Sequence, residues 1–470
     1  RPHLVETMSV FKAYDIRGIA GQDIDFDFSR RLGRSIVEFT QSDSISIGRD
    51  IRSSGETLQE GLVQGIRESG CRVLDLGVVP TGVVYRSSMG LDVDTAVAIT
   101  ASHNPPQYNG FKIVNNGLPI AGEALQQLKL VFDSVGEVPI RGMGKLEDYR
   151  DYHQSVIQEI VSDVGPLTRS VRVAVDGSNS VPGPFMVDVL GKLGADVVAL
   201  NCSWDIDNAA HPADPTRPEN MIQLADQVVK HRCEFGICVD GDGDRIGVVD
   251  ENGSFIHPDR LIGLFASDIL DGMENGVEDD VRTILFDVKC SMGVGQTIER
   301  HGGLPAMVRT GHSFMKKELS DRPDINFAGE MSGHFFFNDR WNGHDCSMYN
   351  SARLIELVSR KMSETGNPMK FSNLMEITPS YPSTGEVKVS FDGDRKAMMT
   401  MVETAFRDME YSSIDGIRVI YPNGWYLCRP SNTEPILVMR AEGTSNSALN
   451  SILGDVKSRI GGFVDLSALS

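Results

Sequence analysis

Residues 95–112 read TAVAITASHNPPQYNGFK, an apolar run followed by a segment rich in turn-forming residues. The run 95–99 predicts a buried strand, and the polar segment with its two prolines predicts a loop. Ser102 is therefore expected at the end of a strand, where α/β sheets carry their functional groups. A serine hydroxyl needs activation or prior modification to act as a nucleophile. Taken alone, the segment is more typical of an ordinary polar turn, so its interpretation depends on loops further along the chain.

The size and charge of the chain exclude several classes of protein. Its 470 residues are too many for one hydrophobic core and predict three or four domains. With 40% hydrophobic and 23% charged residues, the composition is that of a soluble globular protein. The net charge of −20 argues against nucleic-acid binding, and for anionic substrates it requires a locally basic site or a bound cation. No apolar run approaches the roughly 18 residues of a membrane helix.

The seven cysteines are scattered and form no C-x-x-C pair, so neither a disulfide framework nor a zinc motif is indicated. Reduced thiols are typical of a cytosolic protein. Residues 1–9 lack an apolar signal core, which also favours a cytoplasmic location. Because the first residue is Arg1, organellar import with loss of a transit segment remains an alternative.

Three stretches share one order of elements: a β-branched strand, a polar or glycine-rich turn, a helix, a glycine and a second strand. They begin at residues 44, 171 and 283. This spacing is too long for a solenoid, so we predict three successive α/β domains with mainly parallel strands. Polar or Gly/Pro-bearing breaks set the expected domains at 1–150, 151–255, 256–370 and 371–470.

The last hundred residues have a different pattern. Strand-like runs at 416–420, 424–429 and 435–440 lie between helical stretches at 396–409 and 448–460. The sequence therefore predicts three related mixed-sheet α/β domains followed by a smaller C-terminal α+β domain with an antiparallel sheet.

Residues 240–245 read DGDGDR and follow the apolar strand 235–239. Asp240, Asp242 and Asp244 point the same way if the backbone stays extended, and their mutual repulsion favours a bound hard cation such as Mg²⁺. An EF-hand calcium loop fits the aspartate spacing and places Glu251 at its twelfth position. However, Arg245 stands where that loop needs glycine, and a strand rather than a helix precedes it. A solvated acidic turn is the other alternative.

Two later loops carry polar side chains suited to a sugar phosphate. Residues 329–334 read GEMSGH and offer hydrogen-bonding groups for vicinal hydroxyls. Residues 429–435 read RPSNTEP and combine a guanidinium, two hydroxyls and an amide, a set that fits a phosphate. Either loop alone could be a surface turn. Single residues that could join a site, although each alone is more typical of a structural role, are Tyr14, Arg17, Lys289 and His312.

Over essentially its whole length the chain resembles the α-D-phosphohexomutase superfamily. Four loops carry the resemblance, in this order: the serine loop 100–105, the aspartate loop 240–245, the GEMSGH loop 329–334 and the RPSNT loop 429–433. The GEMSGH loop and the continuation of the serine loop are similar to its phosphomannomutase/phosphoglucomutase branch. The resemblance implies three related α/β domains and a smaller fourth around a central cleft. It also implies an isomerase that interconverts hexose 1- and 6-phosphates of mannose and/or glucose.

In that family the serine is carried as a phosphoserine. The resemblance thus implies that Ser102, Asp240, Asp242 and Asp244 hold Mg²⁺ and that a 1,6-bisphosphate intermediate forms and turns over within the site. Glucose 1,6-bisphosphate or mannose 1,6-bisphosphate is the implied activator. Lys112 and His312 are implied in proton transfer. The further implied residues are Arg17 and Arg245 for the reacting phosphate; Tyr14, His103, Lys289, Glu330, Ser332 and His334 for the sugar phosphate; and Arg429, Ser431, Asn432 and Thr433 for the non-reacting phosphate.

Three alternatives remain. A phosphoglucosamine mutase is one, although that branch usually has Gln where this chain has Met331. A serine-dependent sugar phosphatase is another, but it has no need of a second phosphate loop. A non-catalytic relative is the third, and retention of Ser102 and three aspartates argues against it. The expected partners are small-molecule hexose phosphates, with no nucleic acid or membrane, and the chain is expected to be a monomer or weak homodimer.

Overall fold

The computed structural model describes residues 9–136, 140–362 and 369–469. Residues 1–8, which make up most of the N-terminal stretch without a signal core, lie outside the described residues. The chain divides into two compact units. Unit 1 comprises residues 1–256 and 333–373, and unit 2 comprises residues 257–332 and 374–470.

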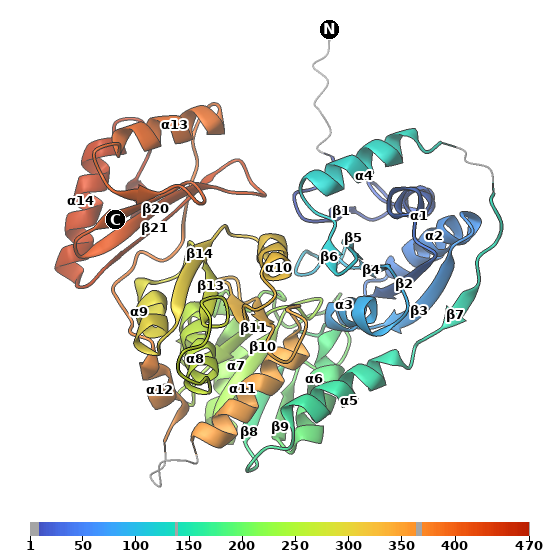
Figure 1. Ribbon diagram of the computed structural model, residues 1–470, viewed down its shortest axis with the longest axis horizontal. Helices are drawn as coiled ribbons and strands as arrows, with labels where there is room; N and C mark the ends of the chain where they lie inside the picture. Colours follow the sequence, from blue (N-terminus) through green and yellow to red (C-terminus); the bar gives the residue numbers. More distant parts are fainter. Residues whose placement is uncertain (1–8, 137–139, 363–368, 470) are drawn as a thin grey trace. The chain divides into compact units, whose positions relative to one another are not determined.

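The first domain of unit 1 is built on a mixed sheet with the strand order β1-β5-β4-β2-β3-β7, and β6 pairs with β5 (Figure 1). Strands β4, β2, β3 and β7 run parallel to one another, whereas β5 is antiparallel to both β4 and β1. The strand bounds are β1 Ile16–Ile19, β2 Ser44–Arg49, β3 Arg72–Val78, β4 Thr95–Ile99, β5 Tyr108–Asn115, β6 Leu118–Pro119 and β7 Leu146–Asp148.

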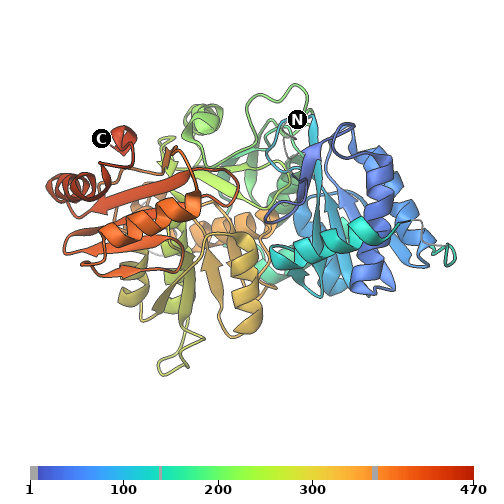
Figure 2. The ribbon, with the colours of Figure 1, turned by 90° about the horizontal axis from the view of Figure 1, so that it is seen from above.

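Helices α1 (Phe26–Thr40), α2 (Gly55–Glu68) and α4 (Glu123–Ser134) contribute to one core with this sheet, and α1 packs on both α2 and α4 (Figure 2). Helix α3 (Thr81–Gly90) packs on β2 and β4. The contact between α1 and α2 is close because glycine lies at it: a Cβ on Gly65 would fall 1.9 Å from the carbonyl oxygen of Arg30. A residue larger than glycine at position 65 would therefore displace one of the two helices.

Glu68 ends α2 and ties it to α1. Its carboxylate, 5% exposed, accepts hydrogen bonds from Arg30 (2.7 Å), Arg34 (2.6 Å) and Gln64 (2.8 Å). Burial opposes ionisation of Glu68, but these hydrogen bonds outweigh it and lower its pKa from 4.5 to about 2. The ionised carboxylate therefore stabilises the fold above pH 4.5, and this contribution is lost as the pH falls towards about 2.

Glu68→Gln is accordingly expected to reduce the free energy of unfolding at neutral pH by on the order of 2 kcal/mol. The deficit should shrink between pH 4.5 and about 2, where wild-type Glu68 itself takes up a proton. Urea unfolding at a series of pH values measures this. Glu60→Gln, at an exposed position of the same helix, should change stability little at any pH. A deficit independent of pH would contradict the electrostatic role of Glu68.

The second domain of unit 1 carries a five-stranded mixed sheet of order β12-β11-β10-β8-β9. Strands β8, β9 and β10 are parallel, and β11 returns antiparallel to β10 directly after the aspartate loop. Helix α11 packs on α5 and α6. In the chain it comes after residues 257–332, which belong to unit 2. The bounds are α5 Tyr152–Val164, β8 Arg172–Asp176, α6 Pro182–Leu193, β9 Asp196–Leu200, α7 Ile222–His231, β10 Phe235–Val239, β11 Ile246–Val249, β12 Phe255–Ile256, β16 Phe335–Phe337 and α11 Ser347–Lys361.

Unit 2 begins with a domain in which β13 pairs in parallel with both β14 and β15. Its α8 packs on α9 and β15. The bounds are α8 Pro258–Asp271, β13 Thr283–Asp287, α9 Met292–Arg300, β14 Leu304–Val308, α10 His312–Asp321 and β15 Phe327–Gly329.

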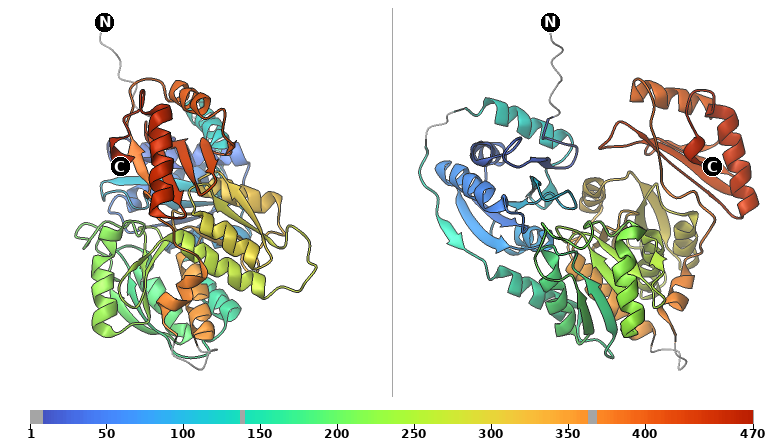
Figure 3. Two further views of the ribbon diagram at one scale, coloured as in Figure 1. Left: turned by 90° about the vertical axis from the view of Figure 1, so that its left-hand side faces the viewer. Right: turned by 180° about the vertical axis from the view of Figure 1, so that it is seen from behind.

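The C-terminal domain of unit 2 has an antiparallel sheet of order β17-β21-β20-β19-β18. Helices α13 and α14 share one core with this sheet (Figure 3). On the sheet, Trp425 and Leu427 pack instead against Val288 of the preceding domain. The bounds are β17 Val387–Val389, α13 Arg395–Ala405, β18 Tyr411–Ser412, β19 Ile417–Tyr421, β20 Gly424–Pro430, β21 Leu437–Gly443 and α14 Asn446–Ile460.

The predicted fold class, α/β domains followed by a smaller α+β domain, is confirmed. One local expectation is wrong. Residues 108–112 were expected to continue the serine loop, but they begin β5, which runs antiparallel to β4 with Lys112 opposite Ala98. Among the helices of the described ranges, none combines the length and apolar character of a transmembrane segment.

Candidate active site

Ser102 lies in a tight loop directly after β4 and is 5% exposed. Its backbone has φ +52°, in the left-handed region that few residues other than glycine adopt. The Oγ atom donates to Oδ1 of Asp242 at 3.0 Å and lies 3.5 Å from Oδ2 of Asp240. The structure therefore places the predicted serine against two of the predicted aspartates.

Arg52 holds the serine loop in this conformation. Its side chain is 1% exposed and donates to four backbone carbonyl oxygens: those of Ser102 (3.0 Å), Asn104 (2.8 Å), Pro105 (2.6 Å) and Tyr108 (3.0 Å). A planar guanidinium can satisfy several acceptors at once in a fixed geometry. Sequence reasoning did not identify Arg52, because a buried arginine whose partners are mostly backbone carbonyls leaves no motif.

Asp50 holds both Arg52 and Thr100, which contact the backbone of Ser102. It lies 3.1 Å from Nε of Arg52 and accepts from Oγ1 of Thr100 at 2.6 Å. Thr100 Oγ1 in turn accepts from the backbone N–H of Ser102 at 3.0 Å. The end of β2 thus fixes both the carbonyl side and the amide side of the serine loop.

The aspartate loop is a compact turn, not the extended segment that the sequence suggested. Oδ1 of Asp240 accepts from the backbone N–H groups of Gly243 (2.9 Å), Asp244 (3.1 Å) and Arg245 (3.2 Å). The backbone carbonyl of Asp242 accepts from Thr81 N at the start of α3. The turn still brings oxygens of all three carboxylates within 4.8 Å of one another, a set of hard donors that suits a divalent cation.

Two cations offset the charge of these buried carboxylates. Nζ of Lys112 lies 2.6 Å from Asp242 and 3.1 Å from Asp244, and Nε of Arg245 lies 3.0 Å from Asp240. Burial opposes protonation of Lys112, but Asp242 and Asp244 outweigh it and raise its pKa well above the usual value. Lys112 is therefore an ammonium ion in this arrangement. Its position on β5 rather than in a loop is what brings it to the aspartates.

The carboxylates themselves differ in acidity. Burial together with the charges of Asp244 and Asp242 raises the pKa of Asp240 well above its usual value. Burial opposes ionisation of Asp244 as well, but the positive charge of Lys112 outweighs it and holds the pKa of Asp244 well below the usual value. A divalent ion bound among these oxygens would favour the ionised form of all of them.

His103 and Arg17 also lie in unit 1 beside this cluster. Burial and then the charge of Arg245 lower the pKa of His103 to about 4, so its imidazole is neutral at neutral pH. Its Nδ1 accepts from Nη2 of Arg245 at 3.2 Å. Arg17, on β1, donates to Oδ1 of Asn104 at 2.8 Å and pairs with Asp15. Tyr14 is half-buried in the turn before β1.

His334 falls in unit 1 with the aspartates, as does Gly333, whereas residues 329–332 of the GEMSGH loop fall in unit 2. Its Nε2 is 3.7 Å from Asp244 and 3.5 Å from Asp345, a buried carboxylate that sequence reasoning missed. Asp214 was also missed: it lies 3.5 Å from the guanidinium of Arg245. No spacing within the sequence links either aspartate to the DGDGDR loop.

Gly241 allows the aspartate loop to reach the serine loop, since a Cβ at this position would lie 1.9 Å from the carbonyl oxygen of Ser102. Gly241→Ala is expected to push the two loops apart, to lower catalytic activity by on the order of 10²-fold and to destabilise unit 1 by about 1 to 3 kcal/mol. Gly191→Ala, in α6 with nothing within 4 Å of the added methyl, is the matched control and should leave activity unchanged. Retained activity in Gly241→Ala would contradict the close contact.

Unit 2 gathers the remaining predicted residues. Glu330 follows β15 and is 1% exposed, and its Oε2 accepts from the backbone N–H of Gly311 at 2.9 Å. His312 is the next residue, the first of α10, and Ser332 lies half-buried two residues beyond Glu330. Nζ of Lys289 is 3.3 Å from Glu386. Burial opposes protonation of Lys289, but Glu386 and Asp287 raise its pKa above the usual value.

The RPSNTEP loop follows β20 in the same unit. Ser431 Oγ accepts from the backbone N–H groups of Thr433 and Glu434, both at 3.2 Å, which forms a turn with Asn432 and Thr433 exposed at its tip. Arg429 is buried with Nε 3.0 Å from Asp415. The amide of Asn432 donates to the carbonyl of Thr310 at 3.4 Å, so the loop lies near the start of α10. The structure thus brings the two predicted recognition loops of unit 2 to neighbouring positions.

Comparison with known families and proteins gives a consistent result. Four family models match successive parts of the chain: phosphoglucomutase/phosphomannomutase alpha/beta/alpha domain I over residues 8–137, domain II over 150–253, domain III over 257–381, and the C-terminal domain over 386–458. The phosphomannomutase/phosphoglucomutase of Pseudomonas aeruginosa is 37% identical over 452 residues, which is 94% of each chain. The phosphoglucomutase of Neisseria gonorrhoeae is 36% identical over 462 residues and 97% of each chain.

Solved structures agree with these relatives. A phosphoglucomutase/phosphomannomutase family protein from Burkholderia thailandensis superimposes with a TM-score of 0.87 at 37% identity, covering 96% of this chain and 97% of that one. An N-acetylphosphoglucosamine mutase variant of Aspergillus fumigatus, solved with glucose 1,6-bisphosphate, shares the fold at 14% identity and a TM-score of 0.59, covering 99% of this chain and 97% of that one.

Proposed function

Because this chain belongs to the phosphoglucomutase/phosphomannomutase family, we propose that it interconverts hexose 1-phosphate and hexose 6-phosphate, with mannose and/or glucose as the sugar. The reaction proceeds through a phosphoserine at Ser102 and a 1,6-bisphosphate intermediate. One observation carries the proposal: Ser102 Oγ lies 3.0 Å from a carboxylate of a buried, metal-compatible aspartate cluster that also binds Lys112.

The donor set supports Mg²⁺ as the cofactor. Three buried carboxylates on one turn offer hard oxygen ligands, and the phosphate of a phosphorylated Ser102 would supply another. When bound, Mg²⁺ neutralises charge on the phosphoryl group and on the aspartates. A phosphate dianion next to these aspartates would otherwise be repelled, so phosphorylation of Ser102 and binding of the cation depend on each other.

The side chains of unit 1 then act on the transferred phosphoryl group. Arg17 and Arg245, with Asn104 and Asp240 holding their guanidinium groups, supply positive charge to it. The ammonium of Lys112, which shares Asp242 with Ser102, can give a proton to the serine oxygen as the P–O bond breaks. His312 of unit 2 is our candidate for removing the proton of the attacking sugar hydroxyl.

Unit 2 carries most of the residues that bind the sugar and its non-reacting phosphate. Glu330 and Ser332, together with His334 of unit 1, bind the sugar hydroxyls. Lys289 and the loop residues Arg429, Ser431, Asn432 and Thr433 bind the phosphate that does not react, with His103 and Tyr14 of unit 1 as further substrate contacts. A second phosphate site lets the bisphosphate be held by either end, and a simple phosphatase has no use for one. This favours a mutase over a serine-dependent phosphatase.

The exposed tip of the RPSNTEP loop allows a direct test of the non-reacting phosphate site. Asn432→Asp adds a negative charge there and is expected to raise KM for hexose phosphates by about tenfold or more with a smaller change in kcat, because like charges repel in the bound complex. Asn423→Asp adds the same charge at an exposed position elsewhere in the same domain and should leave KM unchanged. Equal KM values for the two variants would argue against this role of the loop.

Substrate choice is tested by a mutase assay with Mg²⁺ and a trace of glucose 1,6-bisphosphate. Glucose 1-phosphate, mannose 1-phosphate and glucosamine 1-phosphate are supplied in parallel, and free phosphate is measured in each. Conversion of the first two sugars to their 6-phosphates supports the proposal. Preference for the amino sugar would instead assign a phosphoglucosamine mutase, and free phosphate as the main product would assign a phosphatase.

A further inference from the structure

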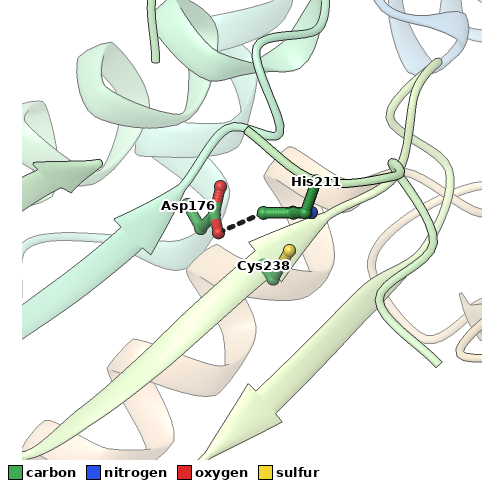
Figure 4. Close-up of side chains that lie close together, drawn as sticks. All are labelled: Asp176, His211 and Cys238. Atoms are coloured by element: carbon green, nitrogen blue, oxygen red, sulfur yellow. Dashed lines mark hydrogen bonds and ion pairs between the residues drawn. The ribbon is translucent and has the colours of Figure 1, made fainter. Parts of the chain in front are cut away.

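A second cluster of metal-ligating side chains lies in the second domain of unit 1. Asp176 is the last residue of β8, and Cys238, on the neighbouring parallel strand β10, is its direct partner in the strand register. His211 reaches them from the segment between β9 and α7 (Figure 4). None of the three belongs to the aspartate, serine or sugar-phosphate loops.

The three side chains converge on one point. A carboxylate oxygen, an imidazole nitrogen and the thiol sulfur all lie within 4.8 Å of one another. Asp176 and Cys238 are fully buried, and the side chain of His211 is 9% exposed. Oδ2 of Asp176 is 2.6 Å from Nε2 of His211.

The surroundings orient these groups as the outer shell of a metal site does. Nδ1 of His211 lies 2.7 Å from the carbonyl oxygen of Pro212, which can only accept, so Nδ1 carries a proton and Nε2 faces the cluster. The other oxygen of Asp176, Oδ1, accepts from the backbone N–H of Ser178 at 2.8 Å and from Asn201 at 3.4 Å. Metal-ligating histidines almost always donate their second N–H to a carbonyl or carboxylate, and ligating carboxylates are themselves hydrogen-bonded.

A simple ion pair between Asp176 and His211 accounts for only part of this arrangement. It explains the short Nε2–Oδ2 contact, but it does not explain why the Cys238 sulfur, which also lies 3.4 Å from Oγ of Ser178, is within 4.8 Å of a ligand atom of each. A proton and a divalent ion can occupy the same position between a carboxylate and an imidazole. The ligands of a tetrahedral ion lie about 3.3 to 3.8 Å apart, so exchange of the proton for an ion requires these two atoms to separate by less than 1 Å.

We propose that Asp176, His211 and Cys238 bind a divalent transition ion of the Zn²⁺ class, at a site separate from the aspartate loop. A mixed oxygen, nitrogen and sulfur set suits Zn²⁺ or Co²⁺, whereas Mg²⁺ takes oxygen ligands. Three protein ligands leave the fourth tetrahedral position for water. The bound ion links the 201–217 segment to the ends of β8 and β10 and so stabilises this domain.

Co²⁺ provides the test, because thiolate ligation to Co²⁺ gives a near-ultraviolet charge-transfer band that carboxylate ligation does not. Co²⁺ is titrated into the full chain in the presence of saturating Mg²⁺. One equivalent is expected to produce the band, and Zn²⁺ should abolish it. The band should be absent from Cys238→Ala and should require at least tenfold more Co²⁺ in His211→Gln. Cys233→Ala, a buried cysteine of the same domain, and Asp242→Asn, in the aspartate loop, are the matched controls and should keep the band.

Thermal unfolding gives a second readout. Zn²⁺ should raise the Tm of the wild type in saturating Mg²⁺, as expected for a ligand that binds only the folded state, and should not raise that of Cys238→Ala or His211→Gln. Absence of the charge-transfer band from the wild type, or its persistence in Cys238→Ala, would overturn the proposal. If Cys238→Ala failed to fold, an unchanged Co²⁺ affinity in His211→Gln would overturn it equally.

Discussion

Ser102→Ala is expected to reduce kcat/KM for hexose phosphate interconversion by roughly 10⁴-fold or more while leaving the fold intact. The variant removes the hydroxyl oxygen that lies against both Asp240 and Asp242. The loop itself should survive, because it is held through backbone atoms by Arg52 and Thr100. Alanine and serine both carry a Cβ, so the left-handed backbone at φ +52° is no more strained in the variant.

Steady-state kinetics with glucose 1-phosphate and mannose 1-phosphate measure this loss. Ser46→Ala is the matched control, a buried serine on β2 of the same domain whose hydroxyl lies 2.8 Å from that of Ser87. It should cost some stability and leave kcat/KM within a few-fold of the wild type. Substantial mutase activity in Ser102→Ala would mean that another group carries the phosphoryl transfer.

Arg52→Met is expected to have the largest effect on stability, lowering the free energy of unfolding of unit 1 by about 3 to 5 kcal/mol. Methionine fills much of the same space but donates nothing. Four backbone carbonyls, including those of Ser102 and Pro105, would lose a buried hydrogen-bond donor. Asp50 would lose the cation with which it pairs. Loss of the loop conformation should also lower kcat.

Arg52→Lys separates positioning from bulk stability. A lysine keeps the charge beside Asp50, but its single ammonium cannot reach four carbonyls in the planar arrangement of a guanidinium. We expect this variant to recover much of the stability and to lower kcat by about tenfold or more with KM little changed. Urea unfolding and kinetics on the same preparations measure both effects. Arg150→Met, at an exposed pair with Asp148, is the control for loss of charge, and equal stability of the two methionine variants would contradict the role of Arg52.

Much of this site could be predicted from the sequence because its residues cluster in short loops after apolar strands. The strand 95–99 places Ser102, and the strand 235–239 places Asp240, by a rule that depends only on hydrophobic pattern and turn composition. The same pattern predicted the α/β domains and the antiparallel C-terminal sheet.

The parts that could not be predicted depend on contacts between distant segments. Tyr108–Asn115 pairs along β4 although Asn109 and Gly110 in its first half are turn-forming residues, so local composition favoured a loop. The aspartate turn folds around Asp240 because three backbone N–H groups converge on that carboxylate, which a spacing of i, i+2 and i+4 does not reveal. Arg52 binds carbonyls about fifty residues away, and carbonyls have no sequence signature.

The GEMSGH loop illustrates a different limit. Glu330, Ser332 and His334 were expected to bind a sugar. Glu330 accepts a hydrogen bond from Gly311 of unit 2, and His334 lies 3.7 Å from Asp244 of unit 1. Adjacency along the chain did not predict which unit each side chain joins. The sequence could therefore identify the loop but not divide its roles.

The central claim is that Ser102 carries a phosphoryl group that passes to and from hexose phosphates. Its most direct test is to incubate the full chain with Mg²⁺ and excess glucose 1,6-bisphosphate, remove the sugar, and determine the intact mass and the modified peptide. We predict a gain of one phosphoryl group on Ser102, and its complete transfer to added glucose 1-phosphate with formation of the bisphosphate. A protein that takes up no phosphoryl group at Ser102, or that passes it to water instead of to the sugar phosphate, would contradict the account.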